Sequence, residues 1–270
     1  MPKKVNKKEL LVNGLDIDKW IEETDATDIV PDESLLKYEI KLVAYLDLLG
    51  ITQEIRNNVN GKETEIISKM SKIKNIVEIE INTAPMNEKM TMLYISDTFI
   101  FVCEPEAIRQ FLQVLSNIQM RILVESKTML RGALECGDVI VQDNGKQIIG
   151  PAFIDAYVKQ ERHAIFPRII IGNSALEIIN AQLGQYREVV ISQDREVSLD
   201  YIAVYMTLES KSINDITTRL RREGVFDHLS NGYKKYNKEN CSSIRSKYAW
   251  TINYLKEKGV WPNEKQYICW

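Results

Sequence analysis

The segment YLDLLGIT, residues 45–52, has an aspartate inside what is otherwise the sequence of a buried strand and a following turn. The residues before the aspartate, EIKLVAYL, are mainly β-branched, aromatic and aliphatic, as a covered strand requires. Gly50 interrupts this pattern, and ITQEI begins a helical one. A charged carboxylate at the end of such a strand is costly when it is unpaired. We therefore expect Asp47 to be paired, and hypothesise that its partner is a metal ion shared with Asp97.

Composition restricts the class of protein. The chain has 270 residues, 44% hydrophobic and 27% charged, which allows one large domain or a main domain with an appendage. A formal net charge of -3 argues against a nucleic-acid partner. No apolar run would span a bilayer and no secretory segment is visible, so we expect a cytoplasmic protein without a membrane partner. The four cysteines are scattered without a CxxC pair, which predicts reduced thiols.

The order of the predicted elements indicates a fold class. Strands are expected at 38–49, 89–96, 98–104, 129–142 and 167–172, and helices at 51–81, 106–126 and 150–164. Ser96 and Asp97 suit the turn of a hairpin, and DNGK at 143–146 is a second hairpin signal. This order predicts an α+β protein with a split βαβ (ferredoxin-like) core and a C-terminal helical extension.

The remaining segments give weaker signals. Residues 1–36 form a basic arm with a possible helix, the main domain is expected over 37–205, and a helical extension over 206–270. REVVIS (187–192) and LDYIAVYM (199–206) are possible further strands. The long polar helices of the tail show no chemistry and suit a cap or a dimerisation element. We interpret Tyr248, Trp250, Ile252 and Leu255 as packing residues.

The split βαβ order brings the two aspartates together. The first strand and the hairpin between the second and third strands are neighbours, so Asp47 and Asp97 can converge. Two hard carboxylates without histidine or thiol suit Mg²⁺ or Mn²⁺. Gly50 lets backbone approach a phosphate, with the amides of the next helix directed at it. These parts suit phosphoryl transfer. The structural alternatives are a capping role for Asp47 and a turn role for Asp97.

These motifs resemble a known family. YLDLLGIT is similar to the first metal motif of class III nucleotidyl cyclases, F-x-D-I-x-G-F-T, and YISDTFIF resembles their second, with Ser96 in place of glycine. LRGALECGDVI and IGPAFIDAYVKQE resemble their RIGIHTG strand and GxxVNxASRME helix, so the resemblance covers roughly residues 38–172. AYLDLLG, RGALECGD, GPAFIDAY…E…PRIII and SKYAW look more narrowly like the bacterial pyrimidine cyclases of antiphage defence. That family converts UTP or CTP to cyclic UMP or cyclic CMP, which activates a separate effector.

The resemblance implies roles for particular residues. Asp47 and Asp97, with the Leu48 carbonyl, would hold two divalent ions, Mn²⁺ or Mg²⁺. Gly50 and Ile51 would contact the substrate. One ion would activate the ribose 3′-hydroxyl and the other would neutralise the triphosphate, giving a 3′,5′-cyclic nucleotide and pyrophosphate. The resemblance also implies a homodimer with active sites at the interface and a cyclase catalytic domain over 37–205.

Two positions of the purine-selecting pattern differ in this chain. The Lys or Glu expected four residues before the second metal aspartate is Leu93, which offers no hydrogen bond. The second base-contacting position is Gln147, whose amide can donate and accept and so matches a cytosine or a uracil edge. Both substitutions favour a pyrimidine. The structural alternatives are a core position for Leu93 and a hairpin flank for Gln147.

The family's transition-state pair, an Asn followed four residues later by an Arg, is replaced by Asp155 and Lys159. A surface ion pair between these two is the favoured interpretation. The candidate catalytic and triphosphate-binding cations are Arg131, Lys159, Arg162 and Arg168, with a structural alternative for Arg131.

Three functions therefore compete. A pyrimidine nucleotide cyclase leads, and Leu93 argues against a purine cyclase. A catalytically inactive nucleotide-binding domain is opposed by the retention of both aspartates and favoured by the missing Asn–Arg pair. The choice between UTP and CTP, the activating signal and the effector stay open.

Overall fold

The computed structural model describes residues 37–57, 63–184, 189–191, 194–209, 212–239, 241–264 and 267. From Tyr38 to Trp270 the chain forms one compact unit. The arm and helix predicted over 1–36 lie outside the described residues, as does Cys269. The three described cysteines, Cys103, Cys136 and Cys241, are free thiols, as predicted.

The centre of the fold is a mixed sheet with the strand order β2-β3-β1-β4-β6-β8-β7. Its strands are β1 (Glu39–Leu49), β2 (Met90–Ile95), β3 (Thr98–Cys103), β4 (Met129–Gln142), β6 (Ile169–Ile171), β7 (Val189–Ile191) and β8 (Val197–Leu199). A further strand, β5 (Gln147–Ile149), pairs with β4. The run β2-β3-β1-β4 is antiparallel throughout, and β4 and β6 are parallel. This is the predicted split βαβ core, and the predicted α+β class is confirmed.

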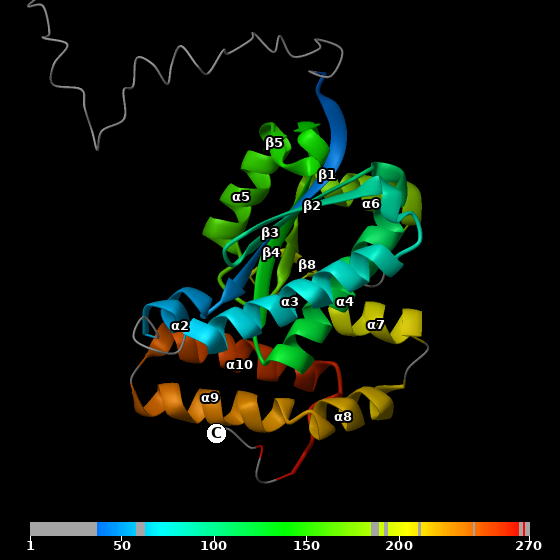
Figure 1. Ribbon diagram of the computed structural model, residues 1–270. Coiled ribbons are helices and arrows are strands. Elements are labelled where there is room, and N and C mark those ends of the chain that lie inside the picture. Colours follow the sequence, from blue (N-terminus) through cyan, green and yellow to red (C-terminus); the bar gives the residue numbers. More distant parts are fainter. Residues whose placement is uncertain are drawn as a thin grey trace, which may run out of the picture. The chain divides into compact units, whose positions relative to one another are not determined.

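Helices cover both faces of the sheet (Figure 1). They are α2 (Ile51–Asn57), α3 (Glu63–Thr83), α4 (Ile108–Ser126), α5 (Pro151–His163), α6 (Asn173–Leu183), α7 (Tyr201–Glu209), α8 (Ile213–Arg222), α9 (Val225–Lys238) and α10 (Ser242–Glu257). Short 3₁₀ turns span Asn87–Lys89, Pro105–Ala107 and Asp143–Gly145. The main apolar core lies between the sheet and α3, α4 and α6, and a smaller one lies under α5.

Strand β1 distributes its side chains between these two cores. Leu42, Ala44, Leu46 and Leu48 are buried in the main core, whereas Val43 and Tyr45 belong to the cluster under α5. Because side chains alternate along a strand, Asp47 follows Val43 and Tyr45 on the α5 face. The aspartate therefore lies outside the main core, at the end of an otherwise well-covered strand.

One predicted strand is wrong. LDYIAVYM was expected to be extended, but β8 ends at Leu199 and α7 begins at Tyr201. The buried Asp200 starts this helix: its carboxylate accepts a 3.1 Å hydrogen bond from the amide of Ala203. The helix is apolar on several sides because it packs between α4 and the C-terminal helices, so its sequence shows no helical alternation of polar residues. The strand expected within REVVIS is present as β7.

The predicted C-terminal helices are present as α8, α9 and α10. With α7 they bury an apolar cluster that also includes Met120 and Leu123 of α4. Ile252 and Leu255 are fully buried and the Trp250 ring stacks on Phe166, which confirms the packing interpretation for these three residues. The Tyr248 ring stacks on Tyr236. The domain boundary predicted at residue 205 falls inside α7 and stays a prediction.

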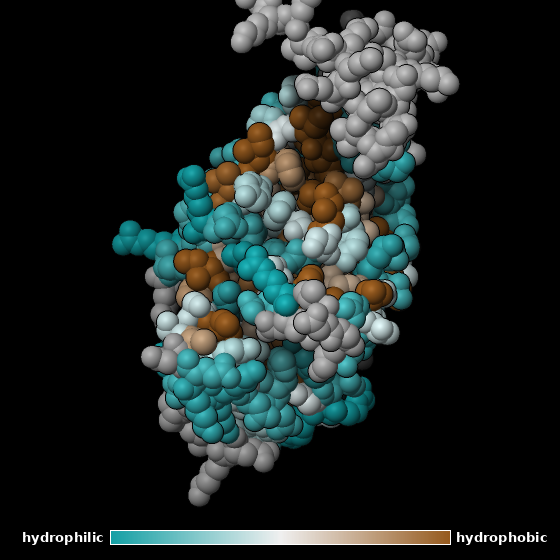
Figure 2. Space-filling view, turned by 60° about the vertical axis from the view of Figure 1, so that its left-hand side comes forward, coloured by the Kyte–Doolittle hydropathy of each residue, from teal (hydrophilic) through white to brown (hydrophobic). Residues whose placement is uncertain are grey.

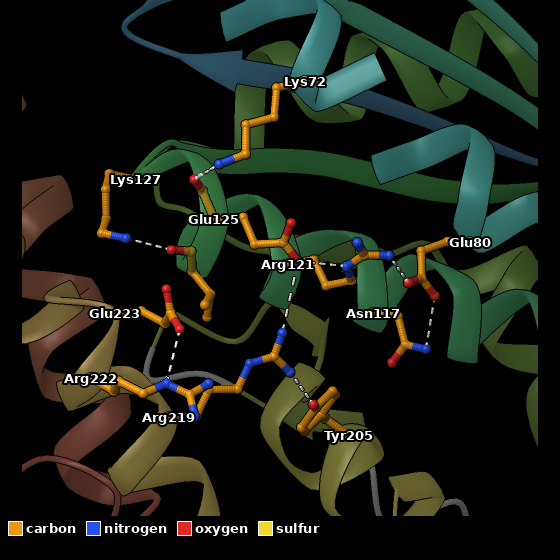
Figure 3. Close-up of polar contacts among 11 residues, drawn as sticks. Lys72, Glu80, Asn117, Arg121, Glu125, Lys127, Tyr205, Arg219, Arg222 and Glu223 are labelled. Atoms are coloured by element: carbon orange, nitrogen blue, oxygen red, sulfur yellow. Dashed lines mark hydrogen bonds and ion pairs between the residues drawn. The ribbon is translucent and has the colours of Figure 1, made fainter. Parts of the chain in front are cut away.

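A carboxylate joins the core to this extension. Glu125 Oε1, on α4, accepts a 2.8 Å hydrogen bond from Nε of Arg121 and lies 3.8 Å from Nη2 of Arg219 on α8 (Figure 3). Arg121 also donates at 2.6 Å to Glu80 on α3. Elements from both parts of the chain thus share one polar network.

Within the described ranges, no helix combines the length and apolar character needed to cross a bilayer.

Candidate functional site

Asp47 and Arg131 form the centre of the candidate site. They occupy directly opposed positions of β1 and β4, and Arg131 Nε donates a 2.8 Å hydrogen bond to Asp47 Oδ2. The two side chains are 19% and 20% exposed. Arg131 Nη1 also donates at 3.4 Å to the carbonyl of Ala164, and Nη2 lies 3.8 Å from Glu161 Oε2 of α5. Within this chain, Asp47 therefore has an arginine as its cationic partner.

The β2–β3 hairpin brings the second aspartate to the end of β1. Ser96 adopts a left-handed conformation with φ 57°, which closes the turn. The Asp97 carbonyl accepts a 3.0 Å hydrogen bond from the amide of Leu48, and its carboxylate Oδ2 accepts one of 3.0 Å from Thr52 Oγ1. The predicted convergence of Asp47 and Asp97 is thus built from backbone pairing at the end of β1 and a side-chain contact to α2.

Negative charge accumulates at this point. Burial raises the pKa of Asp47 above its ordinary value, Arg131 opposes that rise, and the charges of Asp97 and Glu161 add to it. Burial and the charge of Asp97 likewise raise the pKa of Tyr94. Three carboxylates, those of Asp47, Asp97 and Glu161, therefore interact at a site with one arginine. A bound cation would offset this excess of negative charge.

The donor set fits a hard divalent ion. Arg131 occupies Oδ2 of Asp47, which leaves Oδ1 for another ligand. The Leu48 amide points toward Asp97, and because the N–H and C=O of a strand residue share one side, the Leu48 carbonyl faces that side too. Carboxylate and carbonyl oxygens are ligands that Mg²⁺ and Mn²⁺ prefer. No cluster of three or more His, Cys, Asp or Glu side chains suits a metal in the described part of the chain, so a centre here would rest on this pair and the carbonyl.

Gly50 and Ile51 contribute differently from each other. Gly50 has φ +89°, and a Cβ there would meet no atom within 4 Å, so its backbone borders open space. The side chain of Ile51 is fully buried in the main core, so only its backbone could contact a substrate. Helix α2, described over Ile51–Asn57, begins directly after the turn at Gly50.

The two candidate base-contacting residues lie near the β2 edge of the sheet. Leu93 is partly buried against the apolar cluster under α5, and Gln147 is exposed at the start of β5. The turn before β5 lies on β2, because a Cβ at Gly145 would collide with the side chain of Thr91. The hairpin therefore carries Gln147 toward the strand that holds Leu93. The core and hairpin-flank alternatives remain compatible with these positions.

The expected ion pair between Asp155 and Lys159 is not formed. Lys159 Nζ instead lies 3.2 Å from Glu135 Oε1 on β4, and Ser174 Oγ donates a 2.5 Å hydrogen bond to Oε2 of the same carboxylate. Glu135 is buried, and a buried carboxylate needs a cationic partner. Lys159 provides that partner and therefore does not pair with Asp155 on the helix surface. Asp155 is exposed.

The candidate cations differ in availability. Arg131 and Lys159 are bound to carboxylates, and the buried Arg168 donates at 3.0 Å to Asp194. Arg162 is exposed and makes no ion pair with the residues that the structure describes. Glu135 and Glu161 were not foreseen as members of this region. Glu135 lies on β4, and its contact with Lys159 depends on how α5 docks on the sheet, as does the contact of Glu161 with Arg131. No sequence periodicity marks either contact.

Comparisons with known proteins find distant similarity to solved structures. No family model matches the chain, and no curated protein matches its sequence. A class III adenylyl cyclase-like ATP-binding protein from Pseudomonas aeruginosa is 15% identical with a TM-score of 0.47, over 64% of this chain and 41% of its own. A bacterial light-regulated adenylyl cyclase is 14% identical with a TM-score of 0.44, over 69% of this chain and 99% of its own. The guanylyl cyclase domain of a fusion protein from the fungus Blastocladiella emersonii is 16% identical with a TM-score of 0.44, over 60% of this chain and 94% of its own.

Proposed function

We propose that this protein is a nucleotidyl cyclase that converts UTP or CTP to the 3′,5′-cyclic monophosphate and pyrophosphate. The observation that carries the proposal is the convergence of Asp47 and Asp97 beside the open backbone at Gly50. The motif resemblance in residues 38–172 supports the same activity.

The two aspartates and the Leu48 carbonyl would hold two divalent ions, Mn²⁺ or Mg²⁺. When bound, these ions would supply charge neutralisation of the triphosphate and acidify the ribose 3′-hydroxyl. Arg131 holds the Asp47 carboxylate through Oδ2 and so fixes the direction of Oδ1. The backbone of Gly50 and Ile51 would lie against the phosphates, and Arg162 is an accessible cation for the triphosphate.

A pyrimidine preference is supported by Leu93 and Gln147. Leu93 can pack against a base but forms no hydrogen bond with a purine edge. Gln147 is exposed and its amide can both donate and accept, which matches either pyrimidine. A cyclic pyrimidine nucleotide would then act as a second messenger for a separate effector, in antiphage defence as in the family that the motifs resemble.

We further propose that the enzyme is a homodimer with active sites at the subunit interface. Large apolar side chains are exposed on α5 and in the segments that flank it: Ile149, Ile154, Tyr157 and Ile165 are each at least 45% exposed. Figure 2 shows hydrophobic residues gathered on the upper part of this face, at the height of α5 and β5. Such a patch suits burial against a second copy of the chain.

One observation favours a second candidate, a catalytically inactive nucleotide-binding domain. Lys159 is engaged by the buried Glu135, and Asp155 would repel negative charge that develops on a phosphate. No Asn–Arg pair thus stands on α5. An active homodimer would need another cation, such as Arg162, in that role.

The deciding experiment incubates the purified protein separately with ATP, GTP, CTP and UTP in the presence of Mn²⁺, and identifies cyclic products by mass spectrometry. The proposal predicts cyclic UMP or cyclic CMP together with pyrophosphate. Cyclic AMP or cyclic GMP as the main product would establish the purine alternative. Nucleotide binding without any cyclic product would establish the inactive domain.

A further inference from the structure

A cavity of about 410 Å³ opens beside Gly50, between the core and the C-terminal helices. Its walls come from the end of β1, from α2 and α3, from the start of β4, and from α9 and α10. Among its lining residues are four lysines, Lys69, Lys127, Lys235 and Lys247, and a single acidic residue, Glu54. Its size is within the range of small-molecule sites, and four lysines against one glutamate make it strongly cationic.

The glutamate is already neutralised inside the wall. Lys69 Nζ donates 2.8 Å hydrogen bonds to both carboxylate oxygens of Glu54. Lys235 lies 4.0 Å from Glu239, at the outer limit of an ion pair. Lys127 donates at 2.5 Å to the carbonyl of Val124 at the end of α4 (Figure 3). Burial lowers the pKa of Lys127, and the charges of Glu223 and Glu125 oppose that effect. Among the lining side chains, the lysines still outnumber the single carboxylate.

Lys247 is the lysine of the cavity that also interacts electrostatically with the candidate site. It is half-buried on α10, and its amine makes no hydrogen bond or ion pair within the described ranges. Burial lowers the pKa of Lys247, the charge of Arg131 lowers it further, and the charge of Asp47 opposes this. Lys247 therefore lines the cavity and also lies within electrostatic range of the Asp47–Arg131 pair.

The imidazole ring of His228 also lines the cavity. Burial lowers the pKa of His228, the charges of Lys127 and Lys69 add to that effect, and the charge of Glu54 opposes it. The Nε2 atom of His228 is buried without a hydrogen-bond partner in the structure. Four basic side chains and an unsatisfied ring nitrogen thus surround a space that begins at the candidate phosphate-binding turn.

We propose that this cavity receives the polyphosphate end of the nucleoside triphosphate, and that Lys247 of α10 is a phosphate-binding residue. The inference rests on the proposed function, because it takes the substrate to be a nucleoside triphosphate held at Gly50. It assigns chemistry to the C-terminal helices, whose sequence shows none. It also supplies a free cation where Arg131, Lys159 and Arg168 are each bound to a carboxylate.

The binding test uses inorganic tripolyphosphate as the probe, with the full chain in metal-free, low-salt buffer and isothermal titration calorimetry. Lys247→Met keeps the aliphatic stem and removes the charge. A lost charged hydrogen bond predicts that the affinity falls at least tenfold. Lys238→Met removes the same charge from an exposed position on α9 outside the cavity, and is expected to change affinity less than twofold. Lys247→Arg should recover part of the loss, and circular dichroism should show all three variants folded.

The turnover test separates this inference from the proposed function. With Mn²⁺, Lys247→Met should raise KM for the nucleotide, and tripolyphosphate should inhibit the wild-type enzyme competitively. An absence of tripolyphosphate binding, an unchanged affinity in Lys247→Met, or non-competitive inhibition would each overturn the inference. Lys247-dependent tripolyphosphate binding by a protein that cyclises no nucleotide would instead overturn the proposed function and leave the cationic cavity standing.

Discussion

Arg131 and Asp47 face each other across β4 and β1, joined by a 2.8 Å hydrogen bond from Nε to Oδ2. The arginine thus holds a carboxylate whose other oxygen is expected to bind a metal ion. Asp97 and Glu161 add negative charge to the same place, so Arg131 offsets only part of it. This arrangement makes Arg131 a positioning residue for Asp47.

Removing either proposed metal ligand should abolish catalysis without unfolding the protein. Asp47→Ala and Asp97→Ala are each expected to lower kcat at least about hundredfold, because the ions contribute several kcal/mol to the reaction. Asp138→Ala, an exposed aspartate on β4, is the matched control and should keep wild-type turnover. Near-wild-type activity with an unchanged metal requirement in either variant would reject the two-aspartate assignment.

The stability contribution of Asp47 should depend on pH. Because burial raises its pKa above the ordinary value of 3.8, the folded state holds this proton more tightly than the unfolded state. Ionisation of Asp47 therefore costs stability as the pH rises from 3.8 through the raised pKa. The unfolding free energy of Asp47→Asn relative to wild type should increase over that window and then level off. Urea denaturation across the pH series measures this, and a difference that is constant or that decreases with pH contradicts it.

Gly172 should be intolerant of a methyl group. A Cβ there would collide with the Glu135 carboxylate, which is held by Lys159 and Ser174 and cannot move freely. Gly172→Ala is expected to lower the unfolding free energy by about 1–3 kcal/mol, the cost of disrupting a buried charged network. At Gly137 a Cβ would lie 3.5 Å from Ala152, an ordinary contact, so Gly137→Ala should be nearly neutral in the same denaturation experiment. Equal effects of the two substitutions would contradict the steric argument.

Gln147 should contribute to base choice. A buried base edge left without its hydrogen bonds would lose about 1–3 kcal/mol of binding free energy per unpaired group. This corresponds to roughly tenfold to more than hundredfold discrimination in rate between matched and unmatched bases. UTP or CTP should therefore be cyclised at least about tenfold faster than ATP or GTP by this estimate. Gln147→Ala should narrow the gap by slowing the pyrimidine reaction, whereas Gln142→Ala, its register partner on β4, should not. Competition assays with mixed nucleotides measure the ratio, and unaltered selectivity in Gln147→Ala would show that another residue contacts the base.

The exposed apolar face at α5 should hold two subunits together. Ile154 is 57% exposed on α5, and Ile154→Asp is expected to shift a dimer to a monomer and to lower activity with it. Ile67, 65% exposed on α3, provides the matched substitution Ile67→Asp, which should leave the dimer intact. Sedimentation equilibrium gives the masses. A fully active monomer would reject a site shared between subunits.

The strands and helices of the core were predictable because their signals are local. The alternation in β1, the apolar stripe of α4 and the turn at Asp97 each lie within one short segment. The segment at 199–206 failed because α7 is buried on several sides and has no polar face. The side chain of Asp200, which accepts a hydrogen bond from the amide of Ala203, was the available signal for a helix start.

The candidate site was predictable only as far as topology determines it. The strand order alone brings Asp47 and Asp97 together. The contact of Glu161 with Arg131 and that of Lys159 with Glu135 depend on the docking of α5, which no local pattern specifies. Lys247 is separated from Asp47 by most of the chain and reaches its vicinity only through the packing of α10.

Helix α4 contributes to two cores at once. One side packs on the sheet, while Met120 and Leu123 belong to the apolar cluster that α7–α10 cover. A chain cut near residue 205 would expose that cluster to water and lose Lys247 with it. The tail is therefore not an interchangeable module. Recombination that grafted it onto another core, or replaced it with a foreign segment, would disturb folding and the cationic cavity together.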